Sequence, residues 1–84
     1  MKIALGAVPN IDFTDDDRRV ALHTVEVATI DEAKRVLNDF IVDNGLGGGN
    51  CTKNTGRVYD DSGKHVATIS YNLRVWDPNG KEIV

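Results

Sequence analysis

The sequence has few of the residues on which small metal-binding, catalytic or disulfide-linked proteins depend. Its 84 residues include one cysteine and two histidines, and aromatic residues make up 6% of the chain. Cys51 alone cannot form an intrachain disulfide, and small secreted domains usually need such bonds. Neither histidine has a cysteine or acidic residue at ligand spacing, whereas a zinc site needs three or four ligands. We therefore expect no metal, no cofactor and a cytoplasmic location.

Long hydrophobic runs are also missing. No apolar stretch approaches the roughly 20 residues of a membrane-spanning helix, and the first six residues are too weakly patterned for a signal peptide. The composition, 40% hydrophobic and 27% charged, is ordinary for a globular protein. We expect residues 1–84 to form a single domain without contact to a membrane. So short a chain buries only roughly 60–65% of its unfolded surface, which leaves little core for a deep active site.

Basic residues are fewer than acidic residues, and the formal net charge is −3. This balance speaks against a general nucleic-acid binder, which usually carries a basic surface. The charge is uneven, since residues 1–43 hold nine acidic and five basic residues, whereas residues 44–84 hold four acidic and five basic. An acidic segment precedes the second predicted strand and is a candidate surface for a basic partner. Its candidate partner-binding residues are Asp12, Asp15, Asp16 and Asp17.

No pattern for catalysis or nucleotide binding emerges. The glycine-rich segment 47–55 follows a predicted helix, whereas a phosphate-binding loop leads into a helix N-terminus. Thr52-Lys53-Asn54 also lacks the Gly-Lys-Ser/Thr ending of such loops. We interpret this segment as a flexible connector. Cys51 lies within it without a pattern that would stabilise a thiolate, so we expect no enzymatic activity.

The clearest structural signal is an amphipathic helix over residues 29–45. Thr29 and Glu32 fit a capping box, in which each side chain bonds the backbone N–H of the other residue. Gly45 suits the left-handed position that ends a helix, and Leu46 can supply the accompanying apolar contact. The apolar residues recur at helical spacing and predict one buried stripe. They are Ile30, Ala33, Leu37, Phe40 and Ile41.

Alternating and β-branched segments predict strands at residues 2–8, 20–28, 56–60, 65–76 and 81–84. Turn signals separate the last three, at residues 61–64 and 77–80. The expected fold is therefore α+β, with the order β-β-α-β-β-β and one helix packed on a mostly antiparallel sheet of four to five strands. The other sheet face would be open to solvent or to a partner.

The strand over 65–76 is long, and a bend near Tyr71-Asn72 is left open. Its odd-numbered residues from Ala67 to Val75 are apolar, whereas Val66 and the even-numbered residues to Trp76 share the second face. Asn72, Arg74 and Trp76 on that second face are candidate partner-binding residues, because arginine and tryptophan are frequent at binding hot spots. The alternative is that Trp76 folds over the sheet edge and completes the core.

Three segments carry a resemblance to a class of known proteins. They are Thr29-Ile30-Asp31-Glu32-Ala33, the run from Phe40 to Gly47, and Ile69-Ser70-Tyr71-Asn72 followed by Arg74-Val75-Trp76-Asp77. In style the chain resembles small accessory proteins of phages and mobile elements, of the anti-CRISPR and anti-defence type. The resemblance implies a non-enzymatic inhibitor that binds a host protein or nucleoprotein complex in the host cytoplasm.

Two alternatives remain open. The slightly basic second half could form a nucleic-acid-binding module, with Lys53, Arg57, Arg74, Tyr59 and Tyr71 as contact residues. The acidic net charge does not favour this direct binding of nucleic acid. The protein could also be a homodimer or larger structural assembly, paired through an unprotected edge at residues 81–84.

Overall fold

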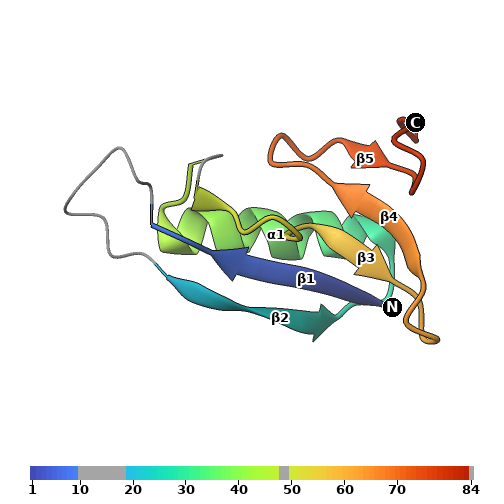
Figure 1. The fold of residues 1–84 in the computed structure, drawn as a ribbon, viewed down its shortest axis with the longest axis horizontal. Helices are drawn as coiled ribbons and strands as arrows, with labels where there is room; N and C mark the ends of the chain where they lie inside the picture. Colours follow the sequence, from blue (N-terminus) through green and yellow to red (C-terminus); the bar gives the residue numbers. More distant parts are fainter. Residues whose placement is uncertain (10–18, 48–49, 84) are drawn as a thin grey trace.

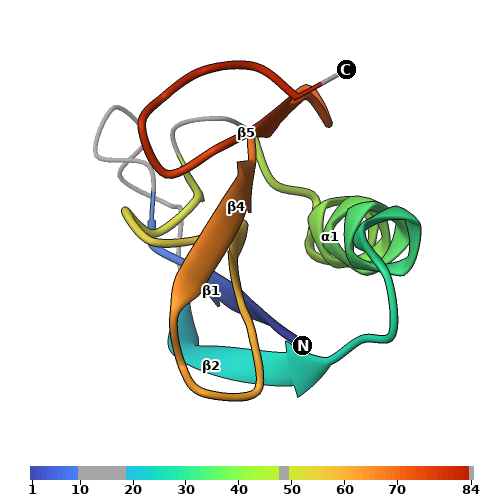
Figure 2. The same ribbon diagram turned by 90° about the vertical axis from the view of Figure 1, so that its right-hand side faces the viewer.

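A computed structural model describes residues 1–9, 19–47 and 50–83. Its elements are β1 (Lys2–Ala7), β2 (Val20–Glu26), α1 (Ile30–Asn44), β3 (Arg57–Tyr59), β4 (His65–Ile69) and β5 (Val75–Trp76). The five strands form one antiparallel sheet in the order β2-β1-β3-β4-β5, with α1 on one side (Figures 1 and 2). The α+β class and the order β-β-α-β-β-β confirm the sequence prediction. No helix in the described ranges is long and apolar enough to cross a membrane.

The core lies between α1 and the central strands. Ile3 of β1 is fully buried and pairs with Val25 of β2 on one side and Val58 of β3 on the other. The helix places Leu37 against this layer at 1% exposure. Burying a side chain of this size contributes about 1.5–3 kcal/mol. The buried stripe predicted from helical spacing is confirmed at Ala33, Leu37 and Ile41, and Ile30 and Phe40 are half-buried beside it.

Both ends of α1 follow from local sequence. The Thr29 hydroxyl accepts a hydrogen bond from the Glu32 N–H at 3.1 Å. The Glu32 carboxylate accepts one from Ala28 at 3.3 Å, one residue before the predicted partner. Gly45 is left-handed, with φ of 62°, and the Leu46 N–H donates to Ile41 O at 2.9 Å. Leu46 is buried, so the predicted apolar stop is confirmed.

The strand predicted over residues 65–76 ends at Ile69, and the bend left open near Tyr71-Asn72 is a hairpin turn. The Ser70 N–H donates to Arg74 O at 2.9 Å and the Leu73 N–H to Ser70 O at 2.8 Å. Thr68 then pairs with Trp76, and Ile69 with Val75. Paired residues face the same side of a sheet. One of these pairs joins two even-numbered residues, and the other joins two odd-numbered residues. The alternation therefore runs in phase through the turn and cannot reveal it.

A second departure concerns Val66. Val58 pairs with Ala67, but Tyr59 pairs with His65, so Val66 lies in a bulge of β4. Val66 packs against the core instead of sharing the face of Thr68. The bulge also turns His65 to the sheet face that points away from α1, which we call the outer face.

The connector after α1 is attached to β1 over its described residues 50–55. Cys51 forms a bridge with Ala7, and the Thr55 hydroxyl donates to Gly6 O at 2.9 Å. The predicted final strand is reduced to one bridge, between Trp76 and Glu82, and a hydrogen bond from Ile83 N–H to Val75 O at 2.8 Å. These contacts place residues 81–83 beside β5.

Candidate functional site

Two of the predicted contact residues meet at the exposed end of the sheet. The Arg74 guanidinium lies over the ring of Trp76, 5.1 Å from its centroid. The same guanidinium donates two hydrogen bonds to the Glu82 carboxylate, at 2.7 and 2.6 Å. The Arg74 side chain is 52% exposed. Both contacts hold this long side chain in place. Binding of a partner would therefore cost less of the side-chain entropy of Arg74.

Asn72, the third predicted residue on this strand, lies in the β4–β5 turn and supports that arrangement. Its side-chain oxygen accepts hydrogen bonds from the Ser70 hydroxyl and, at 3.3 Å, from the Arg74 N–H. The Trp76 indole N–H donates to the Ser70 hydroxyl at 3.2 Å. Trp76 is half-buried on the outer face, so it neither enters the main core nor stands free.

Tyr59 and His65 extend this surface along the outer face. The nucleic-acid alternative places Tyr59 with Arg74, whereas His65 belongs to neither predicted surface. The rings of Tyr59 and His65 lie 5.8 Å apart, and His65 Nε2 lies 2.7 Å from the Thr68 hydroxyl. Thr68 in turn pairs with Trp76. We call this row the outer-face strip; it consists of Tyr59, His65, Thr68, Trp76 and Arg74. His65 joins it only through the bulge at Val66, which the alternation did not indicate.

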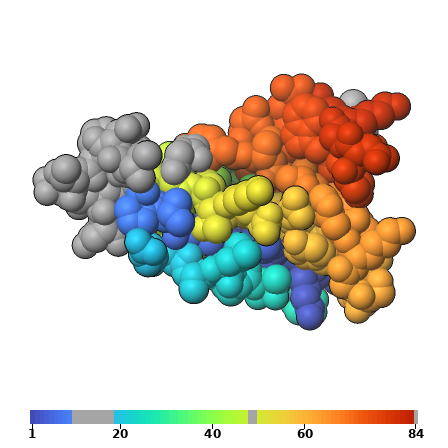
Figure 3. Space-filling model, in the orientation of Figure 1, coloured from blue at the N-terminus to red at the C-terminus, as the bar shows by residue number. Residues whose placement is uncertain are grey.

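The space-filling view shows the sheet face that carries this strip, and very little of α1 is visible there (Figure 3). Segments from β3 to residue 83 occupy its orange and red part. The neighbouring part of the same face is covered by the connector before β3. A Cβ added at Gly6 of β1 would lie 2.8 Å from the Thr52 hydroxyl oxygen. The glycine therefore allows the connector to pack closely on β1.

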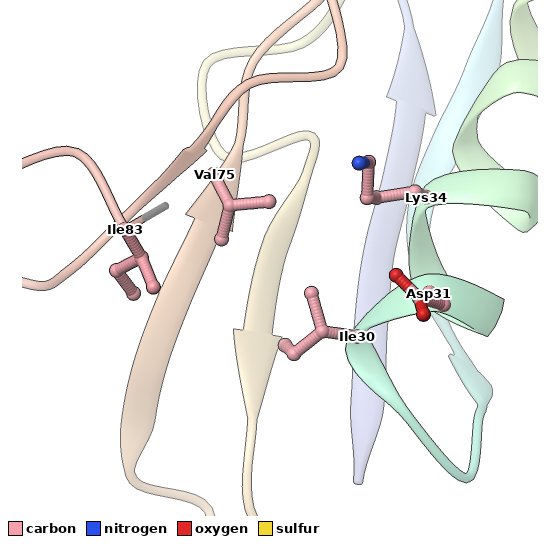
Figure 4. Close-up of a pocket in the computed structure, with 5 residues that line it drawn as sticks. All are labelled: Ile30, Asp31, Lys34, Val75 and Ile83. Atoms are coloured by element: carbon pink, nitrogen blue, oxygen red, sulfur yellow. The ribbon is translucent and has the colours of Figure 1, made fainter.

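On the opposite side of β5 lies an apolar groove of about 280 Å³ (Figure 4). Ile30 and Val75 point toward each other across it, from the start of α1 and from β5, and Ile83 lines its outer end. Asp31 and Lys34 stand on the helix rim. We call these five residues the β5 groove. The sequence analysis missed it, because residues some 45 positions apart form it and no local pattern reports that proximity.

The remaining candidates are the acidic segment and Cys51. Asp12, Asp15, Asp16 and Asp17 lie outside the described residues. Burial raises the pKa of the Cys51 thiol, and its Sγ lies 3.9 Å from Gly47 O. A raised pKa keeps this thiol protonated near neutral pH and makes it a poor nucleophile. Within the described ranges, no group of three or more His, Cys, Asp or Glu side chains could hold a metal ion.

Comparison of the chain with models of protein families, with curated proteins and with solved structures found no match.

Proposed function

We propose that this protein is a non-enzymatic module that binds a partner protein through the β5 groove. The observation that carries the proposal is the open apolar surface between Ile30, Val75 and Ile83 (Figure 4). Ile83 is 48% exposed. Helix α1 packs against β1 near the middle of the sheet, so the β5 side of the sheet is not fully covered.

The groove suits one apolar side chain of a partner, with polar neighbours. Removing apolar surface from water contributes roughly 25 cal/mol per Å², and a pocket that excludes water from an inserted side chain is the usual form of a binding hot spot. Asp31 and Lys34 supply charges of both signs on the rim. These charges would select the residues that flank the inserted side chain, since charge complementarity chiefly determines specificity.

Trp76 of β5 and Arg74, which directly precedes that strand, lie on the outer face. A partner that reached around the β5 end would therefore contact both surfaces. Arginine and tryptophan are enriched at hot spots. The contacts of Arg74 with Glu82 and Trp76 hold this pair in one arrangement before binding. This pre-arrangement supports a binding role for the surface predicted from the sequence.

The test is a comparison of two variants with the same change of charge. Ile83→Asp places a carboxylate in the groove, whereas Val42→Asp does so at an apolar residue outside it that is 68% exposed. Each protein is immobilised and exposed to lysate of the cells in which the gene is expressed. We expect a stoichiometric partner on the wild type and on Val42→Asp, and its loss from Ile83→Asp. A bound set that is identical for all three proteins contradicts the proposal.

The sequence resemblance supports a specific form of this function, in which the partner is a host defence complex and the protein inhibits it. The acidic residues Asp15, Asp16 and Asp17 would then occupy a basic groove that normally holds nucleic-acid phosphates. Expression of the protein in a bacterium with active CRISPR immunity should restore plaque formation by a targeted phage. Replacement of these three aspartates by asparagine should reduce the effect. Unchanged immunity across the CRISPR types tested argues against this form.

The outer-face strip favours a second candidate function, the binding of single-stranded nucleic acid. Tyr59 and Trp76 are aromatic residues on an uncovered sheet face beside Arg74, and bases stack on such surfaces. Trp76 is the one tryptophan of the chain and serves as the probe. Titration with a mixed-sequence oligonucleotide at low salt should quench its fluorescence, and added salt should reverse the change. An unchanged spectrum at low salt rules this candidate out.

A further inference from the structure

The two edges of the sheet differ in how well they are protected. Strand β2 forms one edge and is the longest strand, with seven residues. Residues 21–24 and Glu26 are exposed, and the Leu22 side chain is 47% exposed. Proteins commonly guard an edge with lysine, proline, an inward-pointing charge or a β-bulge. Strand β2 has no lysine or proline and carries its one carboxylate at its end, on Glu26. Its pairing with β1 shifts by one residue between Val20 and His23, so the bulge lies at the start of the strand, and residues 23–26 pair regularly.

The opposite edge of the sheet, at β5, is better protected. Strand β5 has two residues, and residues 81–83 lie beside it through the Trp76–Glu82 bridge. The ion pair between Arg74 and Glu82 holds this segment in place. Irregular, short and charged edges resist pairing with another chain. The edge that could accept a further strand is therefore β2, and not the segment at residues 81–84 that the sequence suggested.

The hydrogen-bond phase of β2 shows which backbone groups face outward. The Val27 N–H donates to Met1 O at 2.9 Å. Antiparallel pairs alternate between hydrogen-bonded and non-hydrogen-bonded, so His23 and Val25 bond toward β1. The N–H and C=O groups of Thr24 and Glu26 then point away from the sheet. Among the described residues, no strand pairs with that side of β2.

We propose that β2 pairs in antiparallel fashion with β2 of a second copy of this chain, about a two-fold axis at Thr24. The pairing places Thr24 opposite Thr24 of the second copy, and Leu22 opposite Glu26 of the second copy. The Thr24 pair uses outward-facing backbone groups, as does Glu26 in the second pair, whereas Leu22 lies in the bulge between Val20 and His23. Threonine pairs across strands are favourable, and the result is one continuous sheet with both helices on the same side.

Charge supports a second copy as the occupant. Glu26 holds the one carboxylate of β2, and in this register the Glu26 residues of the two copies lie four positions apart along the strands. At about 3.3 Å per residue this separation is about 13 Å, which exceeds the Debye length of about 8 Å at physiological salt.

The dimer would leave the β5 groove free, because β2 and β5 lie at opposite edges of the sheet (Figure 1). Each dimer would then present two grooves, which increases apparent affinity for a repeated partner. One pair of strands buries less surface than a standard interface. We therefore expect a dimer whose population depends on concentration.

Sedimentation equilibrium from micromolar to millimolar concentration tests the association. The wild type should approach twice the mass of one chain as its concentration rises. Thr24→Lys and Thr24→Glu should each remain monomeric, because each places like charges opposite each other at the axis. An equimolar mixture of the two should form a heterodimer. Thr24→Val, the matched control, keeps the backbone N–H and should still associate.

Amide hydrogen exchange of the wild type gives a second measurement that needs no variant. The Thr24 and Glu26 amides should exchange more slowly as concentration rises. The His23 and Val25 amides bond to β1 and should be protected at every concentration. A wild type that stays monomeric at millimolar concentration, or a dimer that survives both charged substitutions, overturns the proposal. Concentration-independent exchange at Thr24 does so as well.

Discussion

Arg74 forms a bidentate ion pair with Glu82 while its guanidinium lies over Trp76. The two ion-pair partners are eight residues apart, on either side of the turn that follows β5. The pair joins residues 81–83 to the sheet and places a cation against an indole ring, whose negative face attracts it.

The Arg74–Glu82 pair should make the β5 end sensitive to acid. The hydrogen bonds from Arg74 hold the pKa of Glu82 below its usual value. A lowered folded-state pKa contributes stability that is complete above the ordinary glutamate pKa of about 4.3 and is lost as pH falls through the lowered value. Because the pair is exposed, its effect is local and small. Trp76 fluorescence should therefore change below about pH 4.3.

Glu82→Gln is the control for this prediction. The variant should show the acid-like Trp76 emission at neutral pH and lack the transition. A transition of the same size and midpoint in Glu82→Gln would show that another group causes it.

Gly56 and Gly63 should respond differently to alanine, although both have positive φ, of 92° and 86°. At Gly63 nothing lies near the added Cβ, so the cost is that of the left-handed backbone, about 1–2 kcal/mol. At Gly56 the Cβ would lie 2.1 Å from Ile69 O, and the β3–β4 pairing must shift. Urea denaturation should show Gly56→Ala as the less stable variant, and equal midpoints would contradict the close approach.

At Leu73, replacement by glycine should destabilise the protein less than replacement by alanine, which is the reverse of the usual order. It has a φ of 66°, whereas glycines occupy the corresponding position of the two other hairpin turns, Gly63 and Gly80. Leu73→Ala removes the side chain that packs on the core and keeps the strained backbone. Leu73→Gly removes both, so it should be more stable than Leu73→Ala by about 1 kcal/mol. Thermal or urea unfolding of the two variants measures this difference, and a more stable alanine variant would refute it.

Asn50 should be essential for the connector between α1 and β3. It is 2% exposed, accepts a hydrogen bond from Gly47 N–H at 3.1 Å and donates one to Val8 O at 3.0 Å. Asn50→Ala removes the hydrogen-bond partner of Gly47 N–H and of Val8 O. It should lower the free energy of unfolding by about 1–3 kcal/mol for each of these groups that stays buried. Asn50→Asp keeps the acceptor but turns a carboxylate toward a carbonyl, so it should also destabilise at neutral pH. Wild-type stability of both variants in urea would show that the connector does not depend on Asn50.

The three hairpin turns show what a sequence reading can and cannot recognise. Asp60 and Asp77 each bond backbone N–H groups within their own turn, and a glycine supplies the positive φ three residues later. These residue types announce a turn locally, and both turns were predicted. The turn at Ser70 has the same backbone hydrogen bonds as these two turns, but leucine occupies the position that glycine takes in them. Its sequence therefore continues an alternating pattern, and only the length of the predicted strand indicated a bend near Tyr71-Asn72.

The sequence by itself determined the elements whose causes are local. The Thr29 cap, the apolar stripe through Leu37 and the stop at Gly45 are set by neighbours within one or two helical turns, so α1 and the α+β class were predictable. Tertiary structure decided the bulge at Val66, the hairpin after Ile69 and the β5 groove. In each of these, the outcome depends on pairing and packing between distant segments. Both candidate surfaces at β5 arise from that long-range packing, which periodicity in a single chain does not encode.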